Sequence, residues 1–204
     1  MNNTLVYSIG FLAQGLFSAR LLVQWLLSEK AKKVESPIIY WQLSILASFL
    51  LFIYGWLRDD FAIILGQYIS YFIYIWNLNN KGHWKSLNIL VKSILLLTPA
   101  FVVVYLLFTF ETNFPRLFEN KNIPLGILIF GSLGQIIFTL RFIYQWIYSR
   151  KKGESVFPVS FWLLSLLGTV IIISYGIYRK DPVLVLGQSA GFIAYIRNLW
   201  LSKF

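Results

Sequence analysis

The sequence predicts an all-α membrane protein with seven transmembrane helices, in which two parallel three-helix repeats are joined by a linker helix (3+1+3). Three observations lead to this prediction. The 204-residue chain is 58% hydrophobic and only 13% charged, whereas a soluble domain is about 25% charged. Its apolar stretches reach the ~20 residues that a helix needs to cross a bilayer. Two parts of the chain also repeat each other at one constant offset.

The first three apolar stretches form the first predicted repeat, at residues 5–79. They lie at 5–27, 38–57 and 61–79, separated by polar segments at 28–36 and 58–60. Pro37 precedes the second stretch, at a position where proline is well tolerated in a helix. Each stretch therefore predicts one helix.

The rest of the chain predicts a linker and a second repeat. After a polar break at 79–86, the apolar stretch 87–110 has no counterpart elsewhere, and we assign residues 80–122 to the linker. The second repeat, residues 123–201, contains apolar stretches at 123–148, 159–178 and 182–201. Prolines fall at or near their starts, at Pro124, Pro158 and Pro182.

The distribution of lysine and arginine predicts the orientation in the membrane. With the N-terminus outside, nine basic residues lie in cytoplasmic segments and five on the opposite side. Positive charge in short loops favours the cytoplasmic side, so we predict an outside N-terminus and a cytoplasmic C-terminus. Because topology explains most of the net charge of +10, we expect no nucleic-acid partner.

The internal repeat is long and has no gaps. Residues 10–78 align on residues 131–199, and 25 of the 69 aligned positions are identical. Three helices reverse the direction of the chain, and the additional helix at 87–110 restores it. The repeats should therefore be parallel, an arrangement known from SWEET-type transporters, whose substrate sites lie at the repeat interface near the middle of the membrane.

Two arginines inside predicted helices are the first candidates for a binding site. Arg20 and Arg141 occupy equivalent positions, about eight residues and so roughly 12 Å from the cytoplasmic helix end. An intramembrane charge is costly and needs a partner, but every acidic residue lies in a loop or at a helix end. A phosphate suits a guanidinium, which binds it in a bidentate fork. The alternative is a structural role, with bonds to carbonyls or glutamines.

Polar side chains at helical spacing extend this candidate site. Arg20 and Gln24 share a helix face because they lie four residues apart, and the second repeat has the same spacing. Such polar stripes should face inward, away from lipid, although polar bonds between helices would also explain them. Arg197 and Lys92 lie nearer the interface, and we expect them to reach the membrane surface. The predicted substrate-binding residues are Arg20, Arg141, Gln14, Gln135, Gln24, Gln145, Gln67, Gln188, Tyr74, Tyr195, Asn77, Asn198 and Arg197.

The remaining titratable residues predict no catalytic site. Asp60 and Asp181 begin the third helix of each repeat, where capping is their ordinary role and a functional role stays open. His83, the only histidine, lies in a predicted loop, and the chain has no cysteine. The absence of cysteine excludes a disulfide scaffold and a thiolate zinc site, and no nucleotide-binding or hydrolase motif is present. We therefore expect no catalytic residues, no metal and no cofactor.

One series of residues recurs in both repeats. In the first copy it comprises Gly10, Gln14, Phe17, Arg20, Gln24, Trp25, Ser28, Pro37, Trp41, Ser44, Tyr54, Asp60, Gly66, Gln67, Tyr74 and Asn77, and the second copy runs from Gly131 to Asn198. The series resembles the lipid A biosynthesis N-terminal domain family, which is similar to the PQ-loop and SWEET/SemiSWEET superfamily. Trp76 stands in the first copy where Arg197 stands in the second.

The resemblance implies a role in lipid A or cell-envelope glycolipid metabolism at the bacterial inner (cytoplasmic) membrane. We expect a transporter or flippase of a phosphate-bearing glycolipid, such as a polyprenyl-phosphate sugar, with Arg20 and Arg141 on the phosphate. The expected partner is therefore a membrane lipid or lipid-linked sugar phosphate. One alternative is a non-transporting membrane subunit that recruits or presents lipid to a glycosyltransferase, and another is a SWEET-like carrier of free sugars. A synthase activity is the least expected, because seven helices leave no room for a soluble glycosyltransferase domain.

Overall fold

The fold is all-helical in the residues that the computed structural model describes, 3–58, 61–108 and 124–202. The helices are α1 (Asn3–Ala31), α2 (Ile38–Leu57), α3 (Phe61–Asn80), α4 (His83–Ser86), α5 (Ile89–Phe108), α7 (Leu125–Lys152), α8 (Val159–Tyr178) and α9 (Pro182–Leu201). The predicted helical class is therefore confirmed for this part of the chain. The short helix α4 was not predicted and lies within the expected break at 79–86.

Four of these helices, α1, α2, α7 and α8, are long and apolar enough to cross a membrane. With 29 and 28 residues, α1 and α7 measure about 42 Å, longer than the roughly 30 Å hydrocarbon core. Both helices continue past the ends of the predicted stretches at residues 27 and 148. Their last turns carry the basic residues Lys30, Arg150, Lys151 and Lys152, which suit a helix that extends beyond the apolar layer.

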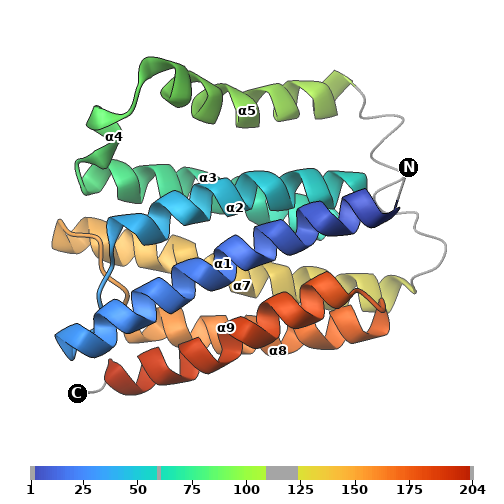
Figure 1. The fold of residues 1–204 in the computed structure, drawn as a ribbon. Coiled ribbons are helices and arrows are strands. Elements are labelled where there is room, and N and C mark those ends of the chain that lie inside the picture. The colour runs from blue at the N-terminus through green and yellow to red at the C-terminus, as the bar shows by residue number, and fades with distance from the viewer. Residues whose placement is uncertain (1–2, 59–60, 109–123, 203–204) are drawn as a thin grey trace.

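The two repeats pack against each other through their first and third helices. Within each repeat, helices that follow one another in sequence are in contact, whereas between repeats α1 contacts α9 and α3 contacts α7. These six helices form a closed ring, and α5 lies outside it (Figure 1), with Leu95 packed against the buried core. Large apolar side chains of α5, such as Ile89 and Phe101, are exposed. The interior of the ring is therefore built from both repeats.

The ring has two interfaces between the repeats and two ends. The α1–α9 seam and the α3–α7 seam are its two interfaces between repeats. The basic end is the end at which α1, α3, α7 and α9 all finish (Figure 1), where α7 contributes Arg150, Lys151 and Lys152. At the opposite end α9 begins.

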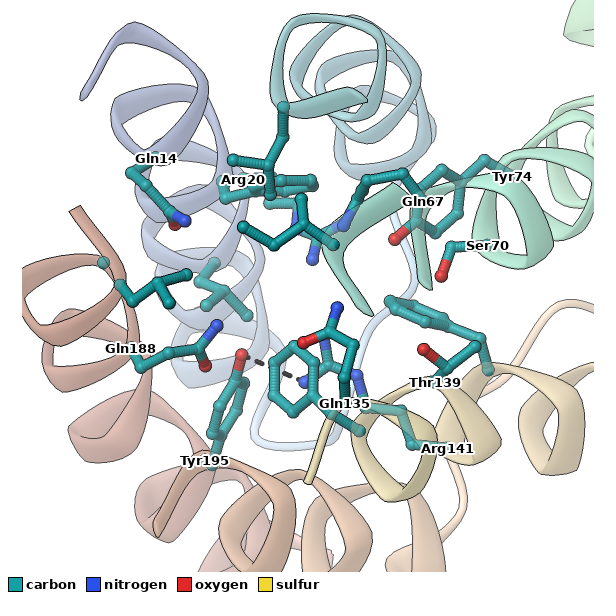
Figure 2. Close-up of a pocket in the computed structure, with 18 residues that line it drawn as sticks. Gln14, Arg20, Gln67, Ser70, Tyr74, Gln135, Thr139, Arg141, Gln188 and Tyr195 are labelled. Carbon is teal, nitrogen blue, oxygen red and sulfur yellow. Dashed lines mark hydrogen bonds between the residues drawn. The ribbon is translucent and has the colours of Figure 1, made fainter. Parts of the chain in front are cut away.

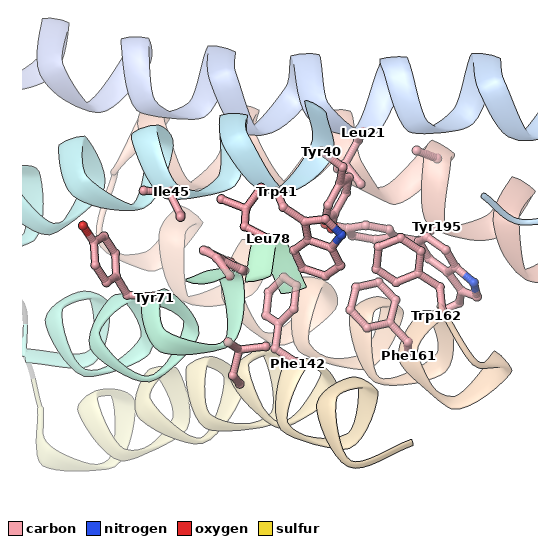
Figure 3. Close-up of a cluster of buried hydrophobic side chains, with 14 residues drawn as sticks. Leu21, Tyr40, Trp41, Ile45, Tyr71, Leu78, Phe142, Phe161, Trp162 and Tyr195 are labelled. Atoms are coloured by element: carbon pink, nitrogen blue, oxygen red, sulfur yellow. The ribbon is translucent and has the colours of Figure 1, made fainter. Parts of the chain in front are cut away.

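Two clusters of buried side chains fill the ring. The cluster nearer the basic end is rich in aromatic residues, including Tyr40, Trp41, Tyr74, Phe142, Phe157, Phe161, Trp162 and Tyr195 (Figure 3). The second cluster is mainly aliphatic and includes Val6, Ala13, Leu51, Tyr54, Ile63, Ile172, Tyr175, Val183 and Leu184. Residues of both clusters line one cavity, which therefore lies between them.

Candidate functional site

A polar cavity lies at the interface of the repeats. The empty space between its side chains is about 590 Å³ with the open mouth included. Side chains from both repeats line it (Figure 2), and its polar members are Gln14, Arg20, Gln67, Ser70, Tyr74, Gln135, Thr139, Arg141, Gln188 and Tyr195. The structure thus brings eight of the thirteen predicted binding residues together, four from each repeat.

Arg20 reaches the cavity from α1 and is buried. Its Nη1 donates a hydrogen bond to Ser44 Oγ at 2.6 Å. Its Cζ lies 4.3 Å from the ring centroid of Phe17 and 4.9 Å from that of Tyr40, close enough for cation–π attraction. The Nε atom is buried without a hydrogen-bond partner, so the guanidinium keeps an unused donor.

Arg141 repeats this arrangement from α7. Its Nη1 donates to Ser165 Oγ at 3.2 Å and to the Tyr195 hydroxyl at 3.1 Å (Figure 2). Its Cζ lies 3.3 Å from the ring centroid of Phe138, and its Nε is also buried without a partner. Ser165 follows Arg141 by 24 residues, as Ser44 follows Arg20. The duplication has therefore kept an arginine–serine contact in both halves.

The charge of the site is positive and uncompensated. Among the described residues, neither Arg20 nor Arg141 forms an ion pair with an acidic side chain. Hydroxyl groups and aromatic rings hold the two guanidinium groups, whereas the structural alternative from the sequence was bonds to carbonyls or glutamines. Because a buried charge without a counter-ion is costly in a membrane, the cavity also favours an anion. A planar guanidinium matches the oxygens of a phosphate.

Two glycines make room for cavity glutamines of the facing repeat. A Cβ atom at Gly66 of α3 would collide with the side chain of Gln135 of α7. A Cβ atom at Gly187 of α9 would collide with Gln14 of α1 in the same way. Small residues let membrane helices approach closely, so these glycines bring the repeats together at the cavity.

Four of the predicted binding residues lie outside the cavity lining and instead join the repeats. Gln24 Nε2 donates to Asn198 Oδ1 at 2.8 Å across the α1–α9 seam. Asn77 Nδ2 donates to Gln145 Oε1 at 3.2 Å, and Gln145 Nε2 returns a bond to Asn77 Oδ1 at 3.0 Å across the α3–α7 seam. All four are fully buried. We call them the amide clasp, because one amide pair closes each seam.

Arg197, the last of the predicted binding residues, also lies outside the cavity lining. Its Nε and Nη2 donate to the two carboxylate oxygens of Glu29, and its Cζ lies 4.3 Å from the ring of Trp200. Glu29 in turn accepts a hydrogen bond from Trp25 Nε1 at 2.8 Å. The sequence predicts that Arg197 reaches the membrane surface. In the structure its guanidinium forms an ion pair with Glu29 across the α1–α9 seam.

Asp181 does more than cap α9. Its Oδ1 accepts the backbone N–H groups of Val183 and Leu184, which is the expected capping role. Its Oδ2 accepts from the Tyr54 hydroxyl at 2.9 Å and from Arg58 Nη2 at 3.4 Å. Tyr54 and Arg58 come from the first repeat, so this buried carboxylate joins the repeats at the end opposite the basic end. Asp60 lies outside the described residues.

Residue spacing alone did not single out several contacts of the site. Ser44 and Ser165 are identical at the offset of the repeat, a signal that could have linked them to the arginines. Phe142 lies near both arginines but has no such signal, because Leu21 stands at the equivalent position. In the described chain, no three His, Asp or Glu residues gather in a way that could hold a metal ion.

Comparison with known proteins identifies both repeats. Residues 9–79 and 130–200 each match the Lipid A Biosynthesis N-terminal domain. The lipid-A-disaccharide synthase of Chlamydia pneumoniae is 31% identical over 204 residues, covering 97% of this chain and 33% of the relative. The enzyme of the same name from Chlamydia felis is 31% identical over 204 residues, covering 95% and 32%. The chain therefore spans about one third of the length of these relatives. No solved structure matches it.

Proposed function

The chain belongs to the Lipid A Biosynthesis N-terminal domain family, and from that premise we propose that it is a transporter or flippase of a phosphate-bearing glycolipid. A polyprenyl-phosphate sugar or a lipid A precursor has the required chemistry. The family supports a role in lipid A biosynthesis, and the four long apolar helices support a membrane location. We place the chain in the bacterial inner membrane.

The strongest support for this proposal is the pair of buried arginines in the cavity. Arg20 and Arg141 occupy equivalent positions of the two repeats, line one cavity and have no acidic partner in the described chain. A carrier of neutral sugars has no need of two buried cations, whereas a phosphate would satisfy both. Charge-assisted hydrogen bonds from guanidinium groups to phosphate are also about twice as strong as neutral ones.

The mechanism we propose is alternating access in a 3+1+3 arrangement of seven membrane-spanning helices. The repeats would rock about the cavity, as in transporters with parallel repeats. Arg20 and Arg141 would hold the phosphate, and Gln14, Gln67 and their equivalents Gln135 and Gln188 would bind sugar or phosphate oxygens. The inter-repeat bonds at the two ends of the ring would then break and form in turn. The N-terminus would lie outside and the C-terminus in the cytoplasm.

Translocation in liposomes tests this function. The purified chain is reconstituted with a fluorescent polyprenyl-phosphate sugar, and a membrane-impermeant quencher reports how much label remains in the outer leaflet. We expect Arg20→Ala and Arg141→Ala each to slow translocation by about tenfold or more, because each removes a charged contact worth ~1.5 kcal/mol or more. Lys30→Ala removes an exposed charge instead and should leave the translocation rate nearly unchanged. Equal rates for all four proteins would refute the phosphate site.

A second function is favoured by the relatives. The matched relatives are named lipid-A-disaccharide synthases, and this chain spans about one third of their length. We therefore keep the alternative that the chain is a non-transporting membrane subunit, which recruits or presents lipid to a glycosyltransferase. Co-purification of such an enzyme, together with an absence of translocation by the chain alone in liposomes, would support the subunit and overturn the flippase.

A further inference from the structure

The two seams between the repeats differ at the basic end. Across the α1–α9 seam, Glu29 and Arg197 form an ion pair with two hydrogen bonds. Trp25 donates to Glu29, and Trp200 lies against the Arg197 guanidinium. Both partners of the pair are partly buried. Charge-assisted bonds of this kind are about twice as strong as neutral ones, so they hold the α1–α9 seam closed.

Among the residues that the structure describes, the α3–α7 seam has no counterpart of this ion pair. The repeat places Arg150 where Glu29 stands and Trp76 where Arg197 stands, and these two side chains cannot form an ion pair. Trp76 instead meets Trp146 edge to face, with centroids 6.3 Å apart. The Cζ of Arg150 lies 5.7 Å from the Trp146 ring, and Arg150 is exposed. The rim of this seam thus combines an aromatic surface with a cation that has no acidic partner in the described residues.

A polar groove opens at the same end of the α3–α7 seam. Its volume is about 960 Å³ with the open solvent included, and its lining comes from the end of α3, the α7–α8 loop and the α1–α2 loop. Lys81, just after α3, is half-buried in this lining. Burial lowers the pKa of Lys81, although Glu35 and Glu154 raise it. Lys33, Glu35 and Glu154 line the groove as well, and at the α1–α9 seam Ser202 stands at the position equivalent to Lys81.

The bonds that close the α3–α7 seam are of a kind that a ligand can replace. Asn77 and Gln145 bond each other, and Ser155 Oγ donates to Asn77 Oδ1 at 2.7 Å. These are neutral groups, and hydroxyl or phosphate oxygens of a head group can take over their hydrogen bonds. The ion pair of the other seam would leave two charges unpaired if it opened, which is costly near lipid.

We propose that the α3–α7 seam at the basic end is the lateral entrance through which a phosphate-bearing lipid reaches the cavity. Arg150 and Lys81 receive the phosphate, and Trp76 and Trp146 contact the hydrocarbon chain, which stays in the bilayer. The α1–α9 seam stays closed during entry. This inference rests on the proposed function, because only a lipid substrate needs an opening toward the membrane.

Cross-linking each seam tests the entrance. The chain has no cysteine, so the pairs Trp76→Cys/Arg150→Cys and Glu29→Cys/Arg197→Cys can be joined with a short bis-maleimide and compared with the same proteins left unlinked. We expect the link across the α3–α7 seam to lower lipid translocation in liposomes by about tenfold or more, equivalent to ~1.4 kcal/mol. The link across the α1–α9 seam should change it less than about twofold. The reverse order, or equal effects, would overturn the proposal.

Photolabelling separates failure of the entrance from failure of the proposed function, because it needs no transport. A polyprenyl phosphate with a diazirine in its chain is irradiated with the reconstituted protein, and labelled peptides are identified by mass spectrometry. We expect labels at Trp76 and Trp146 rather than at Trp25 and Trp200, and weaker labelling in Lys81→Ala/Arg150→Ala but not in Lys30→Ala/Lys85→Ala. Equal labelling of both seams would overturn the entrance. Labelling at the α3–α7 seam without any translocation would retain the lipid site and reject the flippase.

Discussion

Arg20 and Arg141 share the ring of Phe142, whose centroid lies 5.6 Å from one guanidinium carbon and 4.6 Å from the other. Two like charges from opposite repeats are thus brought to a single aromatic side chain in the core. The negative face of an aromatic ring attracts a cation, so Phe142 stabilises charges that no carboxylate neutralises in the described chain. The ring belongs to the second repeat alone, because the first has Leu21 at this position.

Phe142→Leu should destabilise the protein, although leucine is the residue that the first repeat uses. The change removes a fully buried ring and its contact with two cations, which together predict a loss of about 2 to 4 kcal/mol in the free energy of unfolding. Unfolding in mixed detergent micelles measures this loss. Phe101→Leu on α5 is the matched control, because Phe101 is exposed and the same change should have little effect there.

Gly66→Ala and Gly187→Ala should impair transport more than stability. A methyl group at either position collides with Gln135 or Gln14 of the facing repeat, so the glutamine must leave its place in the cavity. Alanine favours a helix over glycine by about 1 kcal/mol, which offsets part of the strain. We expect slower translocation with a nearly unchanged melting temperature. Gly15→Ala is the control, since a Cβ there meets no other atom within 4 Å, and an equal effect of all three variants would contradict the account.

The amide clasp should show coupling within each pair and none between pairs. Gln24 and Asn198 bond each other across one seam, and Asn77 and Gln145 across the other. Double-mutant cycles with alanine should give coupling energies near ~0.6 kcal/mol, the usual worth of such bonds in membranes. The cycle that combines Gln24→Ala with Asn77→Ala is the control, and its two effects should add. Additivity inside both bonded pairs would show that the clasp does not hold the repeats.

Asp181→Asn should be more harmful than Tyr54→Phe. The aspartate is buried and bonded to Arg58, Tyr54 and the start of α9. Neutralising Asp181 leaves Arg58 without its acidic partner, which predicts a loss of about 3 kcal/mol in the free energy of unfolding. Removing the Tyr54 hydroxyl predicts a loss of about 1 kcal/mol. Thermal unfolding of both variants in one detergent compares them directly. A smaller loss in Asp181→Asn than in Tyr54→Phe would contradict the role of this carboxylate.

The sequence was sufficient for the described helices other than α4 and for the two arginines that line the cavity, but not for the partners of the other polar residues. Helical spacing shows that Gln24 and Asn77 face inward, but it cannot show that each meets an amide of the other repeat rather than a ligand. The contact between Glu29 and Arg197 joins residues 168 positions apart, and no local pattern predicts it. Phe142 lies at a position where the two repeats have different residues, so the repeat gives no indication of its role.

Binding of a lipid with and without its phosphate tests the central claim most directly. Native mass spectrometry of the detergent-solubilised protein compares a polyprenyl phosphate with the matching polyprenol, for the wild type and for Arg20→Ala/Arg141→Ala. We expect the wild type to prefer the phosphate by about a hundredfold, since two charged contacts contribute ~1.5 kcal/mol each, and the double variant to lose that preference. An equal preference for the phosphate in both proteins would contradict the claim that these two arginines hold it.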